Sequence, residues 1–125
     1  MRKNKHNAYN ELRTARNKLG LTQQAFAEQL GVARTTISNA EMNQPRPWMV
    51  LACIGLSTLN ILNADIKHLN GETFAQLRGR LQVTQAVLAL RLGMAESTIV
   101  TWERRGPPLW AYPAMVALAS MHMIQ

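Results

Sequence analysis

Four polar residues lie near one another if residues 34–42 form a helix with Ile37 facing inward: Arg34, Thr35, Ser38 and Asn39. Their side chains can recognise a ligand by hydrogen bonding. A guanidinium can donate two hydrogen bonds to O6 and N7 of guanine, and a carboxamide can pair with adenine through one donor and one acceptor. Arg34 and Asn39 are therefore suited to reading the edges of base pairs.

Groups that could catalyse a reaction are not gathered in this way. His6, His68 and His122 are far apart, with no carboxylate or cysteine at the spacing of metal ligands, and Cys53 is the only cysteine. The sequence has no phosphate-binding glycine loop and no helical Glu-x-x-His motif. We therefore expect no catalytic residues, no metal, no cofactor, no small-molecule ligand and no enzymatic activity.

The charge balance of the chain favours a polyanionic partner. Fourteen Lys and Arg residues against seven Asp and Glu give a net charge of +7. Such an excess attracts nucleic acid, because neutralised phosphates release condensed counterions. The longest apolar stretch, 49–59, is too short to cross a bilayer, and no apolar signal region follows the basic N-terminus. We expect a cytoplasmic protein with no membrane association.

The two halves of the chain repeat each other at an offset of 62 residues. Aligning 12–57 with 74–119 needs no gap and gives 15 identities in 46 positions. Among them are Arg16/Arg78, Thr22/Thr84, Gln23/Gln85, Gly31/Gly93, Glu41/Glu103, Pro45/Pro107 and Trp48/Trp110. The sequence therefore predicts two copies of one structural unit. We expect two domains, 1–62 with a basic arm at 1–7, and 63–125, with net charges of +5 and +2.

Each copy has helical periodicity and no strand-like alternation, which predicts an all-α fold. Thr22 can cap a helix and Gly31 can end it, while Pro47 suits the first turn of another. Helices are expected at 9–19, 23–30, 34–42 and 47–56, then at 72–81, 85–92, 96–105 and from beyond 108 to about 124. The apolar segment 59–69 is expected to be a helical connection between the copies.

Segments 21–32 (LTQQAFAEQLGV) and 83–94 (VTQAVLALRLGM) resemble the Cro and phage-repressor (Xre-type) helix-turn-helix family. The likeness continues through ISNAE at 37–41 and IVTWE at 99–103, and covers most of the chain. It implies two tandem lambda-repressor-like domains of four to five helices each. The third helix of each would then enter the major groove of double-stranded DNA.

The resemblance assigns a role to most of the polar positions. Base contacts are expected from Arg34, Thr35, Ser38 and Asn39, and from their counterparts Glu96, Ser97, Val100 and Thr101. Glu96 could accept a hydrogen bond from cytosine N4, and Val100 could contact a thymine methyl group. Phosphate contacts, which fix register, are expected from Gln23, Arg46, Gln85, Arg104 and Arg105, and from Arg2, Lys3 and Lys5 in the arm. Arg16–Glu41 and Arg78–Glu103 are expected to be structural pairs.

Two hypotheses about function remain open. The first is a transcriptional regulator, a repressor of phage or mobile-element type, acting as a single chain with two reading units or as a homodimer. The second is an adaptor or antitoxin-like protein whose N-terminal unit binds DNA and whose less basic C-terminal unit contacts a partner protein.

Overall fold

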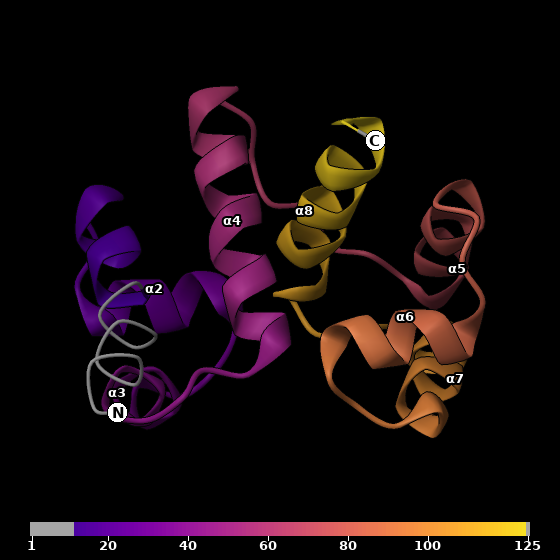
Figure 1. Cartoon of the computed structure of the whole chain (residues 1–125), viewed down its shortest axis with the longest axis horizontal. Coiled ribbons are helices and arrows are strands. Elements are labelled where there is room, and N and C mark those ends of the chain that lie inside the picture. Colours follow the sequence, from indigo (N-terminus) through magenta and orange to yellow (C-terminus); the bar gives the residue numbers. More distant parts are fainter. Residues whose placement is uncertain (1–11, 125) are drawn as a thin grey trace.

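The structure is a computed structural model that describes residues 12–124, with side chains described as far as residue 121. All regular structure in this range is helical, which confirms the all-α prediction. A helical segment at 12–18 is followed by α2 (Gln23–Leu30), α3 (Arg34–Met42), α4 (Pro47–Ile61), α5 (Gly71–Arg80), α6 (Gln85–Leu92), α7 (Glu96–Arg105) and α8 (Ala111–Ile124) (Figure 1). None of the described helices is long and apolar enough to span a bilayer.

The connection between α4 and α5 differs from the expected helix. Helix α4 runs past the expected end at residue 56 to Ile61, where Leu62 caps it. Asn63 then takes a left-handed conformation with φ of 54°, and the chain stays irregular as far as Asn70. The expectation of a helix across 59–69 is therefore wrong beyond residue 62. Ile66 and Leu69 explain its apolar character, because both pack against the core from an irregular segment.

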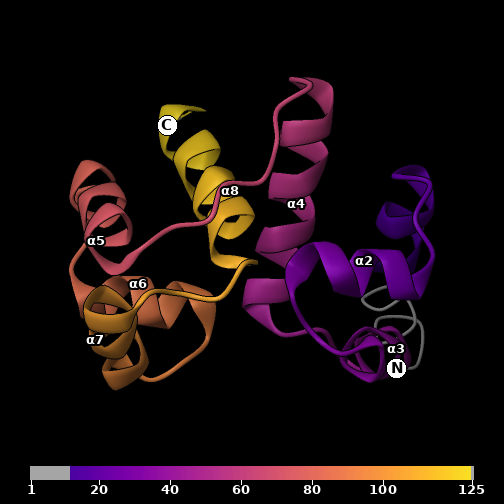
Figure 2. The same ribbon diagram turned by 180° about the vertical axis from the view of Figure 1, so that it is seen from behind.

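Helices α4 and α8 pack against each other in the middle of the molecule. Figures 1 and 2 show α2 and α3 on one side of this pair, and α5, α6 and α7 on the other. Gly55 allows the two helices to approach closely, because a Cβ at this position would lie only 1.7 Å from the carbonyl oxygen of Pro113. Any side chain larger than hydrogen would force the two backbones apart.

One continuous hydrophobic core runs through both halves of the chain. Its fully buried side chains include Phe26, Leu30 and Ile37 in the first half, and Phe74, Leu88, Leu92 and Ile99 in the second. Ala52 of α4 and Ala114 of α8 join these groups across the middle. The halves therefore share their core instead of closing two separate ones.

Two aromatic rings stack across the contact between the halves, and a third packs on one of them from within the second half. Trp48 at the start of α4 stacks on Trp110, with ring centroids 4.2 Å apart and an interplanar angle of 23°. Trp102 of α7 meets Trp110 edge to face at 5.3 Å. Trp48 thus contacts the other half directly, in addition to packing against the core of its own.

Candidate nucleic-acid interface

The turn between α2 and α3 is fixed by residues at both ends of α2. The Thr22 hydroxyl accepts a hydrogen bond from the Ala25 backbone N–H at 3.0 Å, which caps the start of the helix. Gly31 ends it with φ of 72°, a conformation that favours glycine. Ala27 is buried where the helices approach, and its carbonyl accepts a hydrogen bond from the Val32 N–H. Helix α3 therefore leaves α2 at a defined angle.

Helix α3 turns its apolar side inward and its polar side to solvent. Ile37 is fully buried and Ala40 nearly so. Arg34, Thr35 and Asn39 are exposed, and Ser38 is half-buried. The structure thus brings all four predicted base-contacting residues of this helix onto one accessible side. Arg34 is oriented by α2, because its Nη1 donates to Oε1 of Gln23 at 3.3 Å.

The second half places α6 and α7 with the same local devices. Thr84 caps α6 by accepting from the Val87 N–H at 3.1 Å, and Gly93 ends it with φ of 74°. On α7, Ile99 is fully buried. Its accessible side carries the four residues predicted to contact bases there: Glu96, Ser97, Val100 and Thr101.

A buried ion pair ties the helical segment 12–18 to α3. Arg16 donates from Nε to Oε2 of Glu41 at 2.5 Å and from Nη2 to Oε1 at 3.0 Å. Its Nη1 donates to the carbonyl of Leu21 at 2.9 Å. The Nε2 of Gln23 donates to Glu41 Oε1 at 3.0 Å, and Arg13 lies 3.5 Å away. Glu41 is therefore held by three side chains from two elements, the helical segment 12–18 and α2, which fixes α3 in place.

These contacts determine the protonation of Glu41. Burial by itself raises the pKa of a carboxyl group. At Glu41, hydrogen bonds from Arg16 and Gln23, with the charges of Arg16 and Arg13, outweigh burial and keep the pKa below its ordinary value of 4.5. Glu41 is thus a buried carboxylate, neutralised by its partners.

The second half contains the counterpart of this network. Arg78 Nε donates to Oε2 of Glu103 at 2.5 Å, its Nη1 to the carbonyl of Val83 at 3.0 Å, and Gln85 Nε2 to Glu103 Oε1 at 3.0 Å. The hydrogen bond from Arg78 is the main cause that lowers the pKa of Glu103, with Gln85 and the Arg78 charge adding to it against burial.

Gln23 and Gln85 have a role that sequence reasoning did not assign. They were predicted to contact phosphates, but the structure places their side-chain amides against Glu41 and Glu103. A signal existed, because each glutamine recurs in the repeat together with the Arg and Glu residues it joins. For Gln23 or Gln85 to contact a phosphate, the side-chain amide would have to break its hydrogen bond to Glu41 or Glu103.

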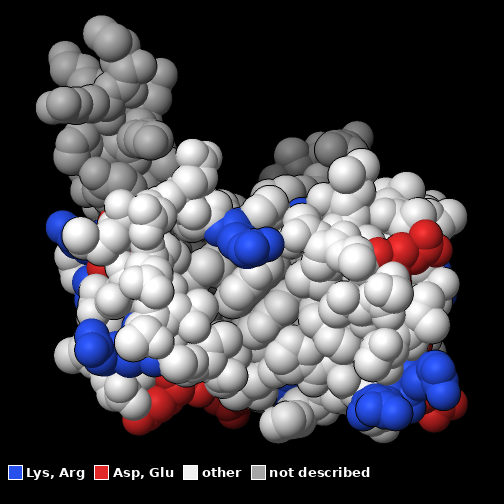
Figure 3. Space-filling model, turned by 90° about the horizontal axis from the view of Figure 1, so that it is seen from below, with Lys and Arg blue, Asp and Glu red and all other residues white. Residues whose placement is uncertain are grey.

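The predicted phosphate-contacting arginines lie at the start of α4 and in the last turn of α7. Arg104 and Arg105 are exposed in the last turn of α7, and Arg46 is exposed just before α4. Figure 3 looks onto the face that carries α3 and α7, with basic side chains at both of its ends and near its middle. Arg2, Lys3 and Lys5 lie outside the described residues.

A hollow of about 410 Å³ with a mixed polar and apolar lining lies between the two halves beside α3. Its lining residues are Thr36, Asn39, Ala40, Asn43, Gln44, Arg46, Trp48 and Met49 of the first half, with Gly93 and Met94 of the second. Hydroxyl, amide and guanidinium groups dominate its polar lining, and no carboxylate contributes to it. These are the groups that bind phosphate and sugar oxygens in protein–DNA contacts.

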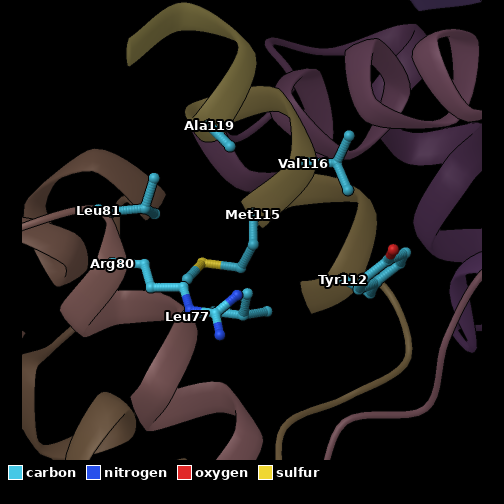
Figure 4. A pocket seen from close by; sticks show the side chains of 7 residues that line it. All are labelled: Leu77, Arg80, Leu81, Tyr112, Met115, Val116 and Ala119. Atoms are coloured by element: carbon cyan, nitrogen blue, oxygen red, sulfur yellow. The ribbon is translucent and has the colours of Figure 1, made fainter. Parts of the chain in front are cut away.

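Elsewhere the described residues offer little chemistry. A pocket of about 290 Å³ between α5 and α8 is mainly apolar, with Arg80 and Met115 in its lining (Figure 4). No group of His, Cys, Asp and Glu within the described part of the chain is arranged to hold a metal ion. Burial raises the pKa of the Cys53 thiol to about 11, so that it stays protonated near neutrality.

Comparison with known proteins finds a family match for the first half of the chain. Residues 12–47 match the family described as helix-turn-helix. The matched stretch contains the helical segment 12–18, α2 and α3, and with them the Arg16–Glu41 pair and the Thr22 cap. Searches of the curated proteins and of the solved structures returned no match.

Proposed function

We propose that this chain, whose residues 12–47 match the helix-turn-helix family, is a sequence-specific regulator of transcription that binds double-stranded DNA in the cytoplasm. Helix α3 reads the major groove, and α7 does the same as part of a second helix-turn-helix. The observation that carries the proposal is the accessible polar side of α3, which a buried ion pair holds against the rest of its unit.

The equivalence of α6 and α7 to α2 and α3 supports the role of the second half. Both pairs have a threonine cap, a left-handed glycine and an Arg–Glu–Gln network at corresponding positions. The net charge of +7 supplies the attraction to phosphates that precedes recognition of bases. The chain then acts by occupying its site and excluding other proteins, as a repressor of phage or mobile-element type does, and not by catalysis.

Replacement of Arg34 tests this assignment. Arg34→Ala should weaken binding to a selected site by about 1–3 kcal/mol and relax the preference at one base position. Arg80→Ala is the matched control, because it removes one positive charge from the pocket between α5 and α8 and not from α3. Titration of labelled duplexes at constant salt measures both effects. Unchanged affinity and unchanged base preference in Arg34→Ala would exclude α3 as the reading helix.

Arg105→Ala distinguishes phosphate contacts from base contacts. It should weaken binding to all sequences alike and reduce the slope of log affinity against log salt concentration by about one. A change in base preference with an unchanged salt slope would contradict the assignment of Arg105 to the phosphate backbone.

A second candidate function rests on the outer side of α6. Val87 is 38% exposed and Leu90 79% exposed, whereas their counterparts in α2 are Ala25 and Glu28. An exposed apolar surface favours contact with a protein, as in an adaptor or antitoxin-like molecule. This alternative predicts that a partner co-purifies in a 1:1 ratio, that Leu90→Glu releases it, and that DNA binding by the same variant is unchanged. A chain that purifies alone excludes it.

A further inference from the structure

Contacts between the two halves come in reciprocal pairs. A Cβ at Gly31 would lie 3.0 Å from the Cβ of Leu109, and one at Gly93 would lie 2.8 Å from the Cγ of Pro47. In the 62-residue register Gly93 corresponds to Gly31, and Leu109 to Pro47. The two contacts are therefore one contact with the halves exchanged. Such reciprocity indicates a two-fold arrangement, because in a head-to-tail arrangement the two halves would contact each other through different surfaces.

Trp48 and Trp110 show where the two-fold axis runs. They are counterparts in the same register, and their rings stack at 4.2 Å. A residue meets its own counterpart at a two-fold axis. Helices α4 and α8 are counterparts as well, and among α2 to α8 they make the most extensive contact. The axis therefore passes between the two rings and between α4 and α8.

This arrangement presents α3 and α7 on one face of the molecule. Both lie on the same side of the molecule in Figures 1 and 2, and the hollow beside α3 is lined by residues of both halves. In two-fold dimers of helix-turn-helix proteins, the reading helices enter successive major grooves about 34 Å apart. Here a single chain supplies both helices, and the packing of α4 on α8 supplies the contact that would otherwise join two subunits.

The two-fold relation breaks at the residues that face the bases. Arg34, a donor, has the acceptor Glu96 as its counterpart, and polar Ser38 has apolar Val100. The guanine edge that offers two acceptors to Arg34 repels a carboxylate at the equivalent position of α7, and Glu96 needs the amino group of cytosine there instead, which means the reversed base pair. The two helices therefore cannot prefer the same half-site, although their backbones are equivalent.

We propose that one copy of this chain fills a complete, non-palindromic operator and binds it in a single orientation. The operator has two unlike half-sites about one helical turn apart. Helix α3 takes the half that presents guanine acceptors, and α7 takes the half that presents a cytosine amino group and a thymine methyl group. This inference rests on the proposed function, and it adds the stoichiometry, the length and the polarity of the site.

The first experiment selects bound duplexes from a random pool with the full chain and weighs the complex. The expected site has two dissimilar halves, and the complex contains one chain of 14.0 kDa per duplex. Two chains on one palindromic site would overturn the inference and leave the proposed function standing. A site confined to a single half would do the same. Selection of no sequence at all would overturn both.

A symmetrising variant gives the sharper test. Glu96→Arg, Ser97→Thr, Val100→Ser and Thr101→Asn together give α7 the reading residues of α3. All four positions are exposed, so the fold should not change. The selected site should become palindromic, with both halves of the type that α3 prefers, and still bind one chain. The reverse variant, Arg34→Glu, Thr35→Ser, Ser38→Val and Asn39→Thr, should yield the other palindrome.

Helical content and the unfolding midpoint, measured for both variants, guard against a failure to fold. If the symmetrising variant folds and still selects the wild-type site, α7 does not read DNA and the inference is wrong. If it selects a palindrome only as a complex of two chains, the single-chain arrangement is wrong. A ten-fold or greater preference of each variant for its own palindrome over the wild-type site would support the inference.

Discussion

Glu41 is completely buried in the first half, whereas its counterpart Glu103 keeps 13% of its side chain exposed. The paired arginines differ in the same direction, with 10% of the Arg16 side chain exposed against 23% for Arg78. The geometry of the two pairs is otherwise alike, with Nε–Oε2 distances of 2.5 Å in both. The two ion pairs have the same residues at the same spacing, but the Arg78–Glu103 pair is more exposed to solvent than the Arg16–Glu41 pair.

Neighbouring positions account for this difference. Next to Glu41 stands the small Ala40, and Arg13 adds a second cation 3.5 Å from the carboxylate. Next to Glu103 stands Trp102, whose ring packs edge to face on Phe74 at 5.7 Å and on Trp110 at 5.3 Å. The first half holds α3 mainly through a desolvated ion pair, and the second half holds α7 through aromatic packing with a more exposed pair.

The largest effect is expected from removal of the buried carboxylate. Glu41→Gln leaves Arg16 without its counter-charge inside the protein, and loss of one partner of a buried pair typically costs about 3–5 kcal/mol. Glu103→Gln should cost roughly half of that, because water can still reach Arg78. Urea unfolding of both variants measures the two losses. Equal losses would show that burial does not distinguish the two pairs.

Next in size is the loss of aromatic packing in the second half. Trp102→Ala removes both edge-to-face contacts and should lower the free energy of unfolding by about 3 kcal/mol. The aromatic contacts of this ring are with Phe74 and Trp110, both in the second half. The measurement that separates the halves is therefore the base selectivity of α3 and of α7, each at its own half-site. We expect Trp102→Ala to weaken reading by α7 more than by α3. An equal loss at both half-sites would mean that Trp102 acts mainly on the contact between the halves.

Acid should weaken both pairs. Because folding lowers the pKa of Glu41 and Glu103 below 4.5, their contribution to stability is complete above that value. It is lost as the pH falls through the lower pKa of the folded protein. Measured unfolding free energies should therefore decline on acidification below 4.5, by about 1.4 kcal/mol for each unit of pKa difference. The double variant Glu41→Gln with Glu103→Gln should show a shallower decline, and an unchanged slope would contradict this origin.

The smallest effect concerns the outer side of α6. Leu90→Glu introduces at α6 the residue that α2 has at its equivalent position, Glu28. Leu90 is 79% exposed, so the free energy of unfolding should change by less than about 0.5 kcal/mol. A loss above about 1 kcal/mol, measured by urea unfolding, would show that this leucine packs in a way that its exposure does not indicate.

The bounds of four helices, α2, α3, α6 and α7, could be predicted from sequence to the residue. For α2 and α6 the reason is local, since Thr22 and Thr84 cap their starts and Gly31 and Gly93 end them. The full length of α4 and the irregular segment after it could not be predicted. Both depend on where Leu59 becomes buried and where Ile66 and Leu69 pack against the core, which is a tertiary property.

The polar faces of α3 and α7 were also within reach of sequence reasoning, because an inward Ile37 or Ile99 fixes which positions turn outward. The hydrogen bonds of Gln23 to Glu41 and of Gln85 to Glu103 could not be predicted, because a glutamine at the start of a helix can point toward the protein or toward solvent. Nor could sequence place the halves relative to each other. That arrangement depends on a backbone approach at Gly55 that no side-chain pattern encodes.

The stacked rings of Trp48 and Trp110 lie where the two halves meet. Indole rings stacked at 4.2 Å couple their electronic transitions, so near-ultraviolet circular dichroism and intrinsic fluorescence report on this junction. The protein thus carries its own optical probe, and separation of the halves becomes visible in solution without any added label.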